Sequence, residues 1–377
     1  MIIYIIFLDI YIILPYNDVY KEINDVYMKK LDYDKYKEKF LTKDILNMIS
    51  AIHEYKGKTT VISAVKKDTL NSLVEVAEIH SIISSNRIEG IYTSEKRLNE
   101  LVNHKIYPSN RCEEEILGYR EVLKIVHADH EYLKISSNYI LQMHRELYAF
   151  SGKSRGGHFK NSDNSIVEID EKGDEKIRFK PISAFQTADY VNDLCDEYNK
   201  AVKNQTLEEL ILIPLFVFDF LCIHPFNDGN GRMSRLITLL LLYKHDYSIG
   251  KYISLERLIE NTKETYYESL QVSGIAWHEN KNNYEPFIRY FLGIMIKAYE
   301  ELEIRIDDLG SRRSTKTDRV ANIVLTKLGK FTKSDILAEC YDVSKITVER
   351  TLNNLLKQGK IIKHSNGPTA FYTVNYD

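Results

Sequence analysis

The segment from His224 to Arg235, HPFNDGNGRMSR, combines side chains and glycines that could bind phosphate groups and react with them. Gly229 and Gly231 permit close backbone approach and positive φ angles, so several backbone N–H groups can converge on one anion. A helix is predicted to begin near Gly231. Its free N–H groups and the positive end of its dipole would add to this anion site, and the Asn230 side chain could supply a further donor.

The charged residues of the same segment extend this chemistry. Arg232 and Arg235 are three residues apart, which places both guanidinium groups on one helix face, where each can bind phosphate oxygens bidentately. Asp228 is compatible with neighbouring phosphates if Mg²⁺ lies between them, because Mg²⁺ usually binds one carboxylate together with substrate oxygens. His224 is the group able to take a proton near neutral pH. A lone histidine or a lone GxG is weak evidence, so the combination carries the prediction of a phosphate site.

Two apolar helices are predicted to position this loop. The segments Leu207–Ile223 and Arg232–His245 have helical periodicity but are apolar on most faces, as expected for helices at the centre of a bundle. Phe226 is expected to anchor the loop on that bundle. Helical periodicity dominates up to about Glu303, so the sequence predicts a mainly α-helical protein.

The region between Asn164 and Pro181 departs from the helical pattern. Apolar residues alternate on both sides of a charged turn at Gly173, which predicts an exposed β-hairpin, or flap, on the helical body. The alternating residues are Ile166, Ile169, Ile177 and Phe179.

A C-terminal domain of different charge is predicted after the polar segment Asp307–Asp318. From Arg312 to Asp377 there are twelve Lys and Arg against six Asp and Glu, a net charge of +6 in a chain whose net charge is -3. The pattern that follows is typical of a winged helix. It predicts a helix, a second helix capped by Thr332, a third helix from Ser344 to Leu356, and two strands that turn at residues 366–368. Such domains bind DNA through the third helix or mediate protein contacts.

Cysteine spacing and hydropathy favour the cytoplasm. The four cysteines form no CxxC pair, so neither a disulfide framework nor a zinc site is indicated. The opening MIIYIIFLDIYIIL is apolar for 14 residues and contains Asp9, whereas a membrane span needs ~20 residues. This segment is therefore expected to be a buried helix, a buried strand, or sequence upstream of the true start codon that was read as protein. No membrane partner is expected.

The segment from His224 to Arg235 resembles the signature H-x-F-x-[DE]-G-N-G-R-x-x-R of the Fic family at every defined position. The resemblance implies a Fic-type helical bundle and transfer of AMP from Mg-ATP to a Ser, Thr or Tyr hydroxyl of a target protein, with release of pyrophosphate. A related branch of the fold that replaces the second glycine and the arginine phosphorylates instead. Because Gly231 and Arg232 are retained here, the resemblance favours nucleotide transfer, and the choice of AMP follows the majority of the family.

The resemblance also implies a role for each motif residue. His224 would deprotonate the attacking hydroxyl, and Asp228 would hold Mg²⁺. Arg232 would bind the outer phosphates, and Arg235 would bind the γ-phosphate. The anion hole for the α- and β-phosphates would be formed by Gly229, Asn230 and Gly231.

A second segment, SSNRIEG at residues 84–90, resembles the inhibitory signature of the same family, [ST]-x-x-x-E-[GN]. Its defined positions are Ser85, Glu89 and Gly90. Ser85 and Glu89 are four residues apart and would share a helix face, from which Glu89 could pair with Arg235 and occupy the guanidinium that the γ-phosphate needs. The resemblance therefore implies autoinhibition by Glu89. In relatives the same glutamate can position a water that removes AMP again.

Two further regions are assigned through the resemblance. The predicted hairpin, with the preceding GKSRGGHFKNSDN, resembles the target-docking flap, where many relatives carry Arg at the position of Lys160. Its strand edges would pair with an extended target segment. Leu258–Leu270 resembles the helix that closes over the adenine, which makes Asn261 and Tyr266 candidate nucleotide contacts. Ordinary helix packing is the alternative for both.

The sequence thus divides into an N-terminal helical region carrying the inhibitory helix (1–135), a Fic catalytic core (136–306), a linker (307–318) and a winged-helix-like domain (319–377). The expected function is a regulated protein adenylyltransferase. The alternative is a DNA-binding transcriptional regulator with a nucleotide-sensing helical domain. Besides ATP, the candidate partners are target proteins at the flap, a second copy of the chain in a homodimer, and DNA.

Overall fold

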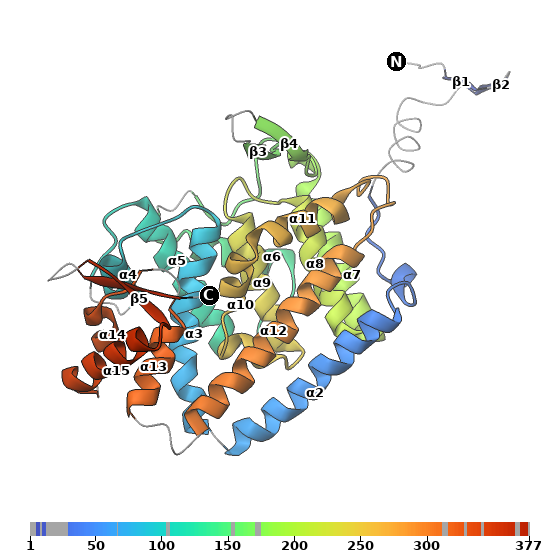
Figure 1. Cartoon of the computed structure of the whole chain (residues 1–377). Helices are drawn as coiled ribbons and strands as arrows, with labels where there is room; N and C mark the ends of the chain where they lie inside the picture. The colour runs from blue at the N-terminus through green and yellow to red at the C-terminus, as the bar shows by residue number, and fades with distance from the viewer. Residues whose placement is uncertain are drawn as a thin grey trace. The chain divides into compact units, whose positions relative to one another are not determined.

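The computed structural model describes residues 5–7, 10–12, 29–65, 67–102, 106–151, 155–169, 175–310, 316–327, 330–340, 343–365 and 370–375. The chain divides into two compact units, Met1–Leu302 and Glu303–Asp377 (Figure 1). Most of the apolar opening segment lies outside the described residues, which there form two short antiparallel strands, β1 (Ile5–Phe7) and β2 (Ile10–Ile12). None of the described helices is long and apolar enough to cross a membrane.

The first unit is mainly α-helical, as predicted, and contains the helices α2 to α11. They are α2 (Lys43–Val65), α3 (Lys67–Ile88), α4 (Glu95–Val102), α5 (Arg111–Asp129), α6 (Ser137–Leu147), α7 (Thr187–Asn204), α8 (Glu209–Ile223), α9 (Asn230–Lys244), α10 (Leu255–Asn261) and α11 (Lys263–Gly274). Three short 3₁₀ helices are η1 (Asp34–Tyr36), η2 (Ala184–Gln186) and η3 (Ser248–Lys251). The long helix α12 (Glu285–Gly310) begins in the first unit and ends in the second.

The two predicted apolar helices are α8 and α9, and they lie in the core of the first unit. In α8 every residue except Glu209 and Leu221 is buried. It packs against α7 and α9, and α9 also packs against α3 and α5. A helix that is apolar on all faces must be covered on all faces, so this central position follows from the sequence.

The buried carboxylate of α8 is satisfied by three ring-bearing side chains. Asp219 accepts hydrogen bonds from Trp277 Nε1 at 2.7 Å, Tyr284 OH at 2.8 Å and Tyr33 OH at 3.0 Å. A buried carboxylate without such partners would cost several kcal/mol. These bonds therefore fix the C-terminal half of α8, from which the candidate active-site loop emerges.

The predicted hairpin is formed by β3 (Ile166–Ile169) and β4 (Glu175–Phe179), which pair antiparallel. It projects from the helical body of the first unit (Figure 1). The register pairs Val167 with Ile177, and an irregularity lies between Ile166 and Val167. The predicted turn residue Gly173 lies outside the described residues.

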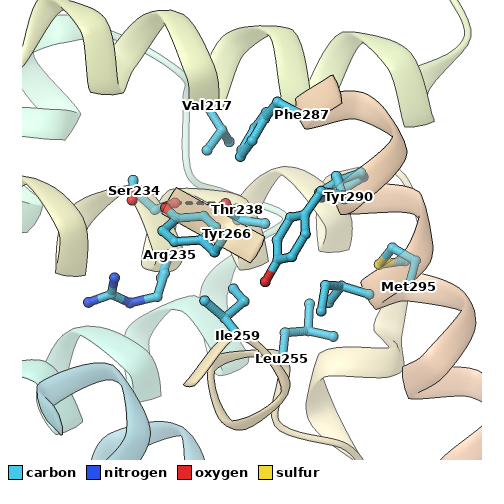
Figure 2. Close-up of a pocket in the computed structure, with 12 residues that line it drawn as sticks. Val217, Ser234, Arg235, Thr238, Leu255, Ile259, Tyr266, Phe287, Tyr290 and Met295 are labelled. Atoms are coloured by element: carbon cyan, nitrogen blue, oxygen red, sulfur yellow. Dashed lines mark hydrogen bonds between the residues drawn. The ribbon is translucent and has the colours of Figure 1, made fainter. Parts of the chain in front are cut away.

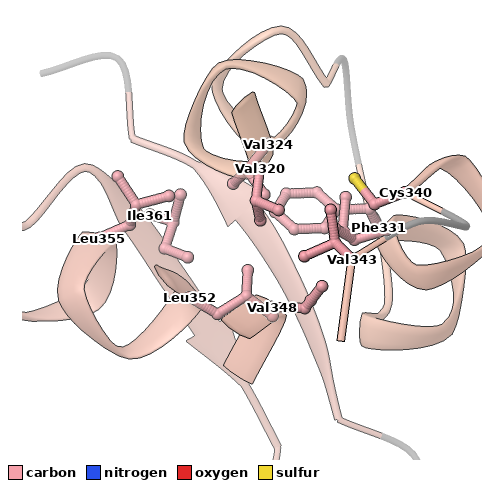
Figure 3. Packing of buried hydrophobic residues seen from close by; sticks show 10 residues of the cluster. Val320, Val324, Phe331, Cys340, Val343, Val348, Leu352, Leu355 and Ile361 are labelled. Carbon is pink, nitrogen blue, oxygen red and sulfur yellow. The ribbon is translucent and has the colours of Figure 1, made fainter. Parts of the chain in front are cut away.

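The second unit has a hydrophobic core of its own (Figure 3). Its elements, besides the end of α12, are α13 (Lys316–Leu325), α14 (Lys333–Glu339), α15 (Lys345–Lys357), β5 (Ile361–His364) and β6 (Phe371–Val374). The buried core residues are Val320, Val324, Phe331, Ile336, Cys340, Val343, Val348, Leu352, Leu355 and Ile361. β5 and β6 pair antiparallel, and Phe331 forms an isolated antiparallel bridge with Tyr372.

Two helices of this unit, α14 and α15, start at the predicted caps. Thr332 Oγ1 accepts the Asp335 N–H at 3.3 Å, and the Asp335 carboxylate accepts the Thr332 N–H at 2.6 Å, which completes a capping box. Ser344 caps α15. The turn residues 366–368 lie outside the described residues. The order of elements is the predicted one, and the winged-helix assignment stays a prediction.

The linker predicted at Asp307–Asp318 begins later in the structure. Helix α12 continues to Gly310, α13 begins at Lys316, and residues 311–315 lie outside the described residues. Ile306 is buried and the helix continues past it, into residues whose polar side chains suit a helix end as well as a linker.

Candidate active site

His224 ends α8 with its imidazole held in one tautomer. Its φ is +51°, and its backbone N–H donates to the Phe220 carbonyl at 3.0 Å. Nδ1 lies 3.3 Å from the Leu221 carbonyl oxygen. Because a carbonyl only accepts hydrogen bonds, Nδ1 carries the hydrogen and Nε2 keeps its lone pair. Burial lowers the pKa of His224 to about 4, and the nearby Lys160 ammonium acts in the same direction. The imidazole is therefore neutral at neutral pH and can accept a proton at Nε2.

The loop between α8 and α9 is fixed by hydrogen bonds and stacking. Asn230 Oδ1 accepts the Phe226 N–H at 2.9 Å, and Asn230 Nδ2 donates to the Phe226 carbonyl at 2.8 Å. The buried Phe226 ring stacks on His144 at a centroid distance of 3.7 Å. Phe226 thus anchors the loop as expected. Asn230 Nδ2 has a second hydrogen besides the one that binds Phe226, so the expectation that this side chain donates to an anion stays a prediction.

His144 also holds the backbone of the metal-binding candidate. Its Nδ1 accepts the Gly157 N–H at 3.0 Å, so Nε2 carries the hydrogen and donates to the Asp228 carbonyl at 3.1 Å. Burial lowers the pKa of His144 to about 4. The neutral tautomer that makes both bonds is therefore the stable form near neutral pH.

The N-terminus of α9 is covered by a carboxylate. Gly229 precedes the helix with a φ of +86°, which a side chain would disfavour. The Met233 N–H donates to the Gly229 carbonyl at 2.9 Å, so the N–H groups of residues 230–232 precede the intrahelical ladder. A Cβ atom on Gly231 would lie only 2.1 Å from Glu89 Oε1. An acidic oxygen thus lies against the helix turn that the sequence predicts to bind phosphate, in the place where a helix dipole favours an anion.

The same Glu89 pairs with the buried Arg235. Glu89 Oε1 lies 2.8 Å from Arg235 Nη2. Ser85 accepts two further bonds from this guanidinium, at 2.9 Å through Oγ and 2.8 Å through its carbonyl. Helix α3 ends at Ile88, so Glu89 lies in the turn beyond the helix, and Gly90 has a φ of +76°. Two of the three residues of the predicted inhibitory segment, Ser85 and Glu89, therefore contact the motif at Arg235.

Arg232 is buried and keeps unused donors. Its Nη2 lies 2.8 Å from Glu115 Oε2 and donates to Tyr148 OH at 2.8 Å. Within the described part of the chain, Arg232 Nε and Nη1 have no hydrogen-bond partner. Buried donors without partners are rare and costly, so two unused nitrogens here suit an added anionic ligand.

Asp228 is accessible and is paired with a cation. Its side chain is 54% exposed, and its Oδ2 lies 2.9 Å from Arg111 Nη2. The Nε of Arg111 also lies 2.6 Å from Glu115 Oε1. Asp228 borders a polar recess of about 420 Å³. The other residues that line it are His144, Tyr148, Arg155, His158, Phe159, Asn161 and Asn227.

The donor set at Asp228 fits a metal brought by the substrate. The described residues contain no group of three or more His, Cys, Asp or Glu that could hold a metal ion. Mg²⁺ commonly binds through one or two carboxylates, with waters and phosphate oxygens as its other ligands. A single accessible carboxylate beside a phosphate site meets that requirement once Arg111 gives way.

The two candidate nucleotide contacts lie in different environments. Tyr266 is buried in α11 and lines a cavity of about 30 Å³ next to Arg235, whose guanidinium points away from it (Figure 2). Asn261 ends α10, is exposed, and does not line this cavity. The cavity holds one or two waters but no purine ring. The nucleotide contacts of both residues stay predictions.

Sequence reasoning missed four side chains that hold the motif, namely Arg111 and Glu115 of α5, His144 of α6 and Tyr148 after α6. A signal existed for one of them, because an acidic residue on a buried helix face is rare without a partner. Glu115 is such a residue, since it is 3% exposed. No pattern in the sequence marks Tyr148.

Comparison with known proteins gives a family, relatives and a fold. Residues 134–242 match the model of the Fic/DOC family. The chain is 24% identical over 185 residues to "Protein adenylyltransferase fic-1" of Caenorhabditis elegans, covering 48% of this chain and 32% of that protein. It is 22% identical over 250 residues to "Protein adenylyltransferase Fic" of Nematostella vectensis, covering 64% and 52%. The chain thus spans about a third of the length of the first relative and about half of the length of the second.

The structural comparison concerns the fold. A crystal structure of a Fic family protein from Desulfovibrio desulfuricans G20 matches with a TM-score of 0.59 at 21% identity, covering 89% of this chain and 97% of that chain. At this identity the match establishes the helical architecture, and the chemistry has to be argued from the side chains.

Proposed function

We propose that this chain, which carries a domain of the Fic/DOC family over residues 134–242, transfers AMP from Mg-ATP to a hydroxyl side chain of a protein, its own chain included. The position of His224 is the observation that supports this most strongly. Its free Nε2 lies at the end of α8, directly before the loop that leads into α9. Transfer of a phosphorus-linked group to an alcohol requires a base next to an anion-binding site.

In this reaction the attacking hydroxyl loses its proton to Nε2 of His224 while its oxygen bonds the α-phosphorus. The bond from that phosphorus to the oxygen bridging the α- and β-phosphates breaks, and pyrophosphate leaves. N–H groups of Asn230 and Gly231 stabilise the negative charge on the phosphate, and that of Gly229 joins them once it leaves Asp228 Oδ1, which it contacts at 2.7 Å. One such donor is worth ~3 kcal/mol of barrier. When bound through Asp228 and phosphate oxygens, Mg²⁺ supplies charge neutralisation.

The two arginines would bind the outer phosphates by different routes. Arg232 can use Nε and Nη1 without losing Glu115 or Tyr148. Arg235 has to exchange Glu89 for a phosphate oxygen, because that carboxylate occupies its Nη2. The described state is therefore proposed to be an inhibited one, in which Glu89 takes the place of the γ-phosphate.

Intact mass spectrometry after incubation with Mg-ATP tests the activity. In a Glu89→Gly background we expect a mass gain of one or more AMP groups. Adding His224→Ala should lower the rate by roughly 10²- to 10⁴-fold, as for loss of a general base. The matched control is His53→Ala, since His53 is an exposed histidine of α2. An adduct that forms equally fast without His224, or no adduct on the chain or on added cell proteins, would contradict the proposal.

The inhibitory role of Glu89 is tested by labelled ATP. We expect Glu89→Gly to incorporate roughly 10-fold more AMP than the wild type, because removing a competing interaction of about 1.4 kcal/mol is worth a factor of ten. Glu89→Gln should act in the same direction, since it removes the charge and keeps the size. Equal turnover in all three proteins would remove Glu89 from the regulation.

The same carboxylate would also suit removal of AMP, by orienting a water toward the phosphorus of a modified protein. Protein labelled by Glu89→Gly should then lose label when wild-type enzyme is added. Retention of the label would restrict the enzyme to the forward reaction.

The β3–β4 hairpin is proposed as the docking edge for the target. An extended target segment would add to a strand edge by main-chain hydrogen bonds. The cross-strand pair Val167 and Ile177 is exposed. It gives that edge an apolar neighbour, against which a target side chain could pack.

DNA binding is the second candidate function, and the surface of α15 favours it. Arg350, Asn353 and Lys357 are exposed and recur at helical spacing, on the helix that a winged helix would insert into the major groove. A gel shift with duplex DNA that weakens as salt rises, and that Arg350→Ala with Lys357→Ala abolishes, would support it. The control is Lys203→Ala, an exposed lysine of α7 in the first unit. The absence of a salt-sensitive shift would exclude it.

A further inference from the structure

Lys160 contacts the backbone around the candidate base without belonging to the motif. It is 3% exposed. Its Nζ donates to the Ile223 carbonyl at 3.0 Å and to Asn164 Oδ1 at 3.0 Å. Its backbone N–H donates to the Pro225 carbonyl at 2.8 Å. Ile223 and Pro225 are the sequence neighbours of His224, so one residue binds the carbonyls on both sides of the base.

These bonds act where the backbone needs support. His224 has a left-handed φ of +51°, which is uncommon outside glycine and costs free energy unless the surroundings hold it. The Ile223 carbonyl belongs to the last turn of α8, where carbonyls lack intrahelical partners and a cation is favoured by the helix dipole. Asn164 adds a further bond, because its Nδ2 donates to the Phe226 carbonyl at 3.2 Å. We call Lys160 and Asn164 together the clamp. Residues 160–164 thus bind the carbonyls of residues 223, 225 and 226.

Stability alone is a weak reason for this arrangement. Taking an ammonium group out of water costs free energy, and an apolar side chain of similar volume is often as stable or more so. Burial lowers the pKa of Lys160 to about 8, against the opposing influence of Asp163. The buried Lys160 cation costs free energy, and its bonds are directed at the residues on both sides of His224. This arrangement indicates that Lys160 serves to hold the conformation of His224.

We propose that Lys160 is a positioning residue, which fixes the His224 imidazole for the proposed AMP transfer, on which this role depends. Through the carbonyls of Ile223 and Pro225 it sets the direction in which Nε2 points. It touches neither ATP nor the target in this role. Its loss should therefore affect turnover more than nucleotide binding.

Lys160→Met and Lys160→Arg test the role in the Glu89→Gly background. The methionine keeps the length and loses the amine, so we expect kcat for AMP incorporation to fall by ~10²-fold, the effect of misplacing a reacting group by about 1 Å. The Kd for Mg-ATP, measured by calorimetry, should change little, because the N-terminus of α9 and the arginines are untouched. Lys160→Arg keeps a cationic donor for the Ile223 carbonyl and should restore most of kcat.

Lys244→Met is the matched control. Lys244 also donates to a backbone carbonyl, that of Leu133 at 2.8 Å, but at the opposite end of α9. The Lys244→Met substitution should leave kcat unchanged. Asn164→Ala removes the other side chain of the clamp and should lower kcat with ATP binding retained. It decides the question if Lys160→Met is unfolded at the assay temperature.

Three results would overturn the role. They are an unchanged kcat in a folded Lys160→Met protein, a loss of kcat matched by an equal loss of ATP affinity, and an unchanged kcat in Asn164→Ala when Lys160→Met does not fold. If the Glu89→Gly reference itself transfers no AMP, the proposed function fails, and that outcome is distinct from an active reference that tolerates Lys160→Met.

Discussion

Arg235 shows how one buried charge can define the state of the site. Its guanidinium is 3% exposed and is held by Ser85 and Glu89. A buried cation that loses its anionic partner is strongly destabilised. Under the proposed function, Glu89 and a phosphate oxygen would be alternative partners for the same nitrogen, and the protein would exchange one for the other when the triphosphate binds.

His224 would give the proposed reaction a defined pH dependence. Burial lowers its pKa to about 4, and a general base works in its unprotonated form. The initial rate of AMP incorporation by Glu89→Gly should therefore show no loss from protonation of His224 as the pH falls from about 7 to about 5.5, whereas an ordinary histidine would lose half of its base form near pH 6.5. A decline centred near pH 6.5 would contradict the neutral state of the part-buried imidazole.

Helices α5 and α6 supply most of the side chains that hold the motif in place. Glu115 and Arg111 come from α5, and His144 comes from α6, followed by Tyr148. The two helices approach closely at Gly118, where an added Cβ would lie 1.9 Å from the Leu147 carbonyl oxygen. That oxygen belongs to the backbone and cannot turn away as a side chain can.

Gly118→Ala should therefore destabilise the protein and disturb the Arg232 partners together. Overpacking of this kind costs ~1–3 kcal/mol or more, and the free energy of urea unfolding measures it. Gly57→Ala is the control, because Gly57 lies in α2 with no atom near its missing Cβ. That change should be neutral or stabilising by up to ~1 kcal/mol. Equal stability of the two variants would show that α5 and α6 can separate without cost.

The sequence predicted the helices and the loop of the site better than their partners. Helices α8 and α9 are apolar on nearly all faces, and the glycines between them mark a loop that leads into a helix N-terminus, so both were predictable from local pattern. The bond from Arg235 to Ser85 spans 150 residues, and that from Arg111 to Asp228 spans 117. Which helix faces meet over such separations depends on packing, which periodicity does not specify.

Glu89 and Asn230 show how far reasoning from a motif reaches. Glu89 was identified through a resemblance, and in the structure it contacts Arg235. The side chain of Asn230 was assigned to an anion because an amide beside two glycines is a good donor. In the structure both ends of that amide also close the loop on Phe226, a role that the sequence did not predict, and the second Nδ2 hydrogen is left for the predicted anion. The nature of a donor was readable from the sequence, but its acceptor was not.

The two units of the molecule have separate hydrophobic cores. That of the second unit is built from α13, α14, α15 and the β5–β6 hairpin, with Leu352 at 1% exposure (Figure 3). None of the motif residues belongs to it. The chemistry proposed for the first unit therefore needs no side chain from this core.

Leu352→Ala should destabilise the second unit and leave AMP transfer intact. Truncating a buried leucine costs ~2–5 kcal/mol, which calorimetry or urea unfolding should detect in the full-length chain. In a Glu89→Gly background the rate of AMP incorporation should stay at the reference level below the unfolding transition. A parallel fall in activity would show that the second core supports the active site.

The binding of a triphosphate at the start of α9 is tested most directly by a crystal structure of Glu89→Gly with Mg²⁺ and ATP. We predict the α-phosphate on the N–H groups of residues 229–231, the γ-phosphate on Arg235 in place of Glu89, and His224 Nε2 facing the α-phosphorus. A nucleotide bound elsewhere, or an empty site at saturating ATP, would contradict this arrangement.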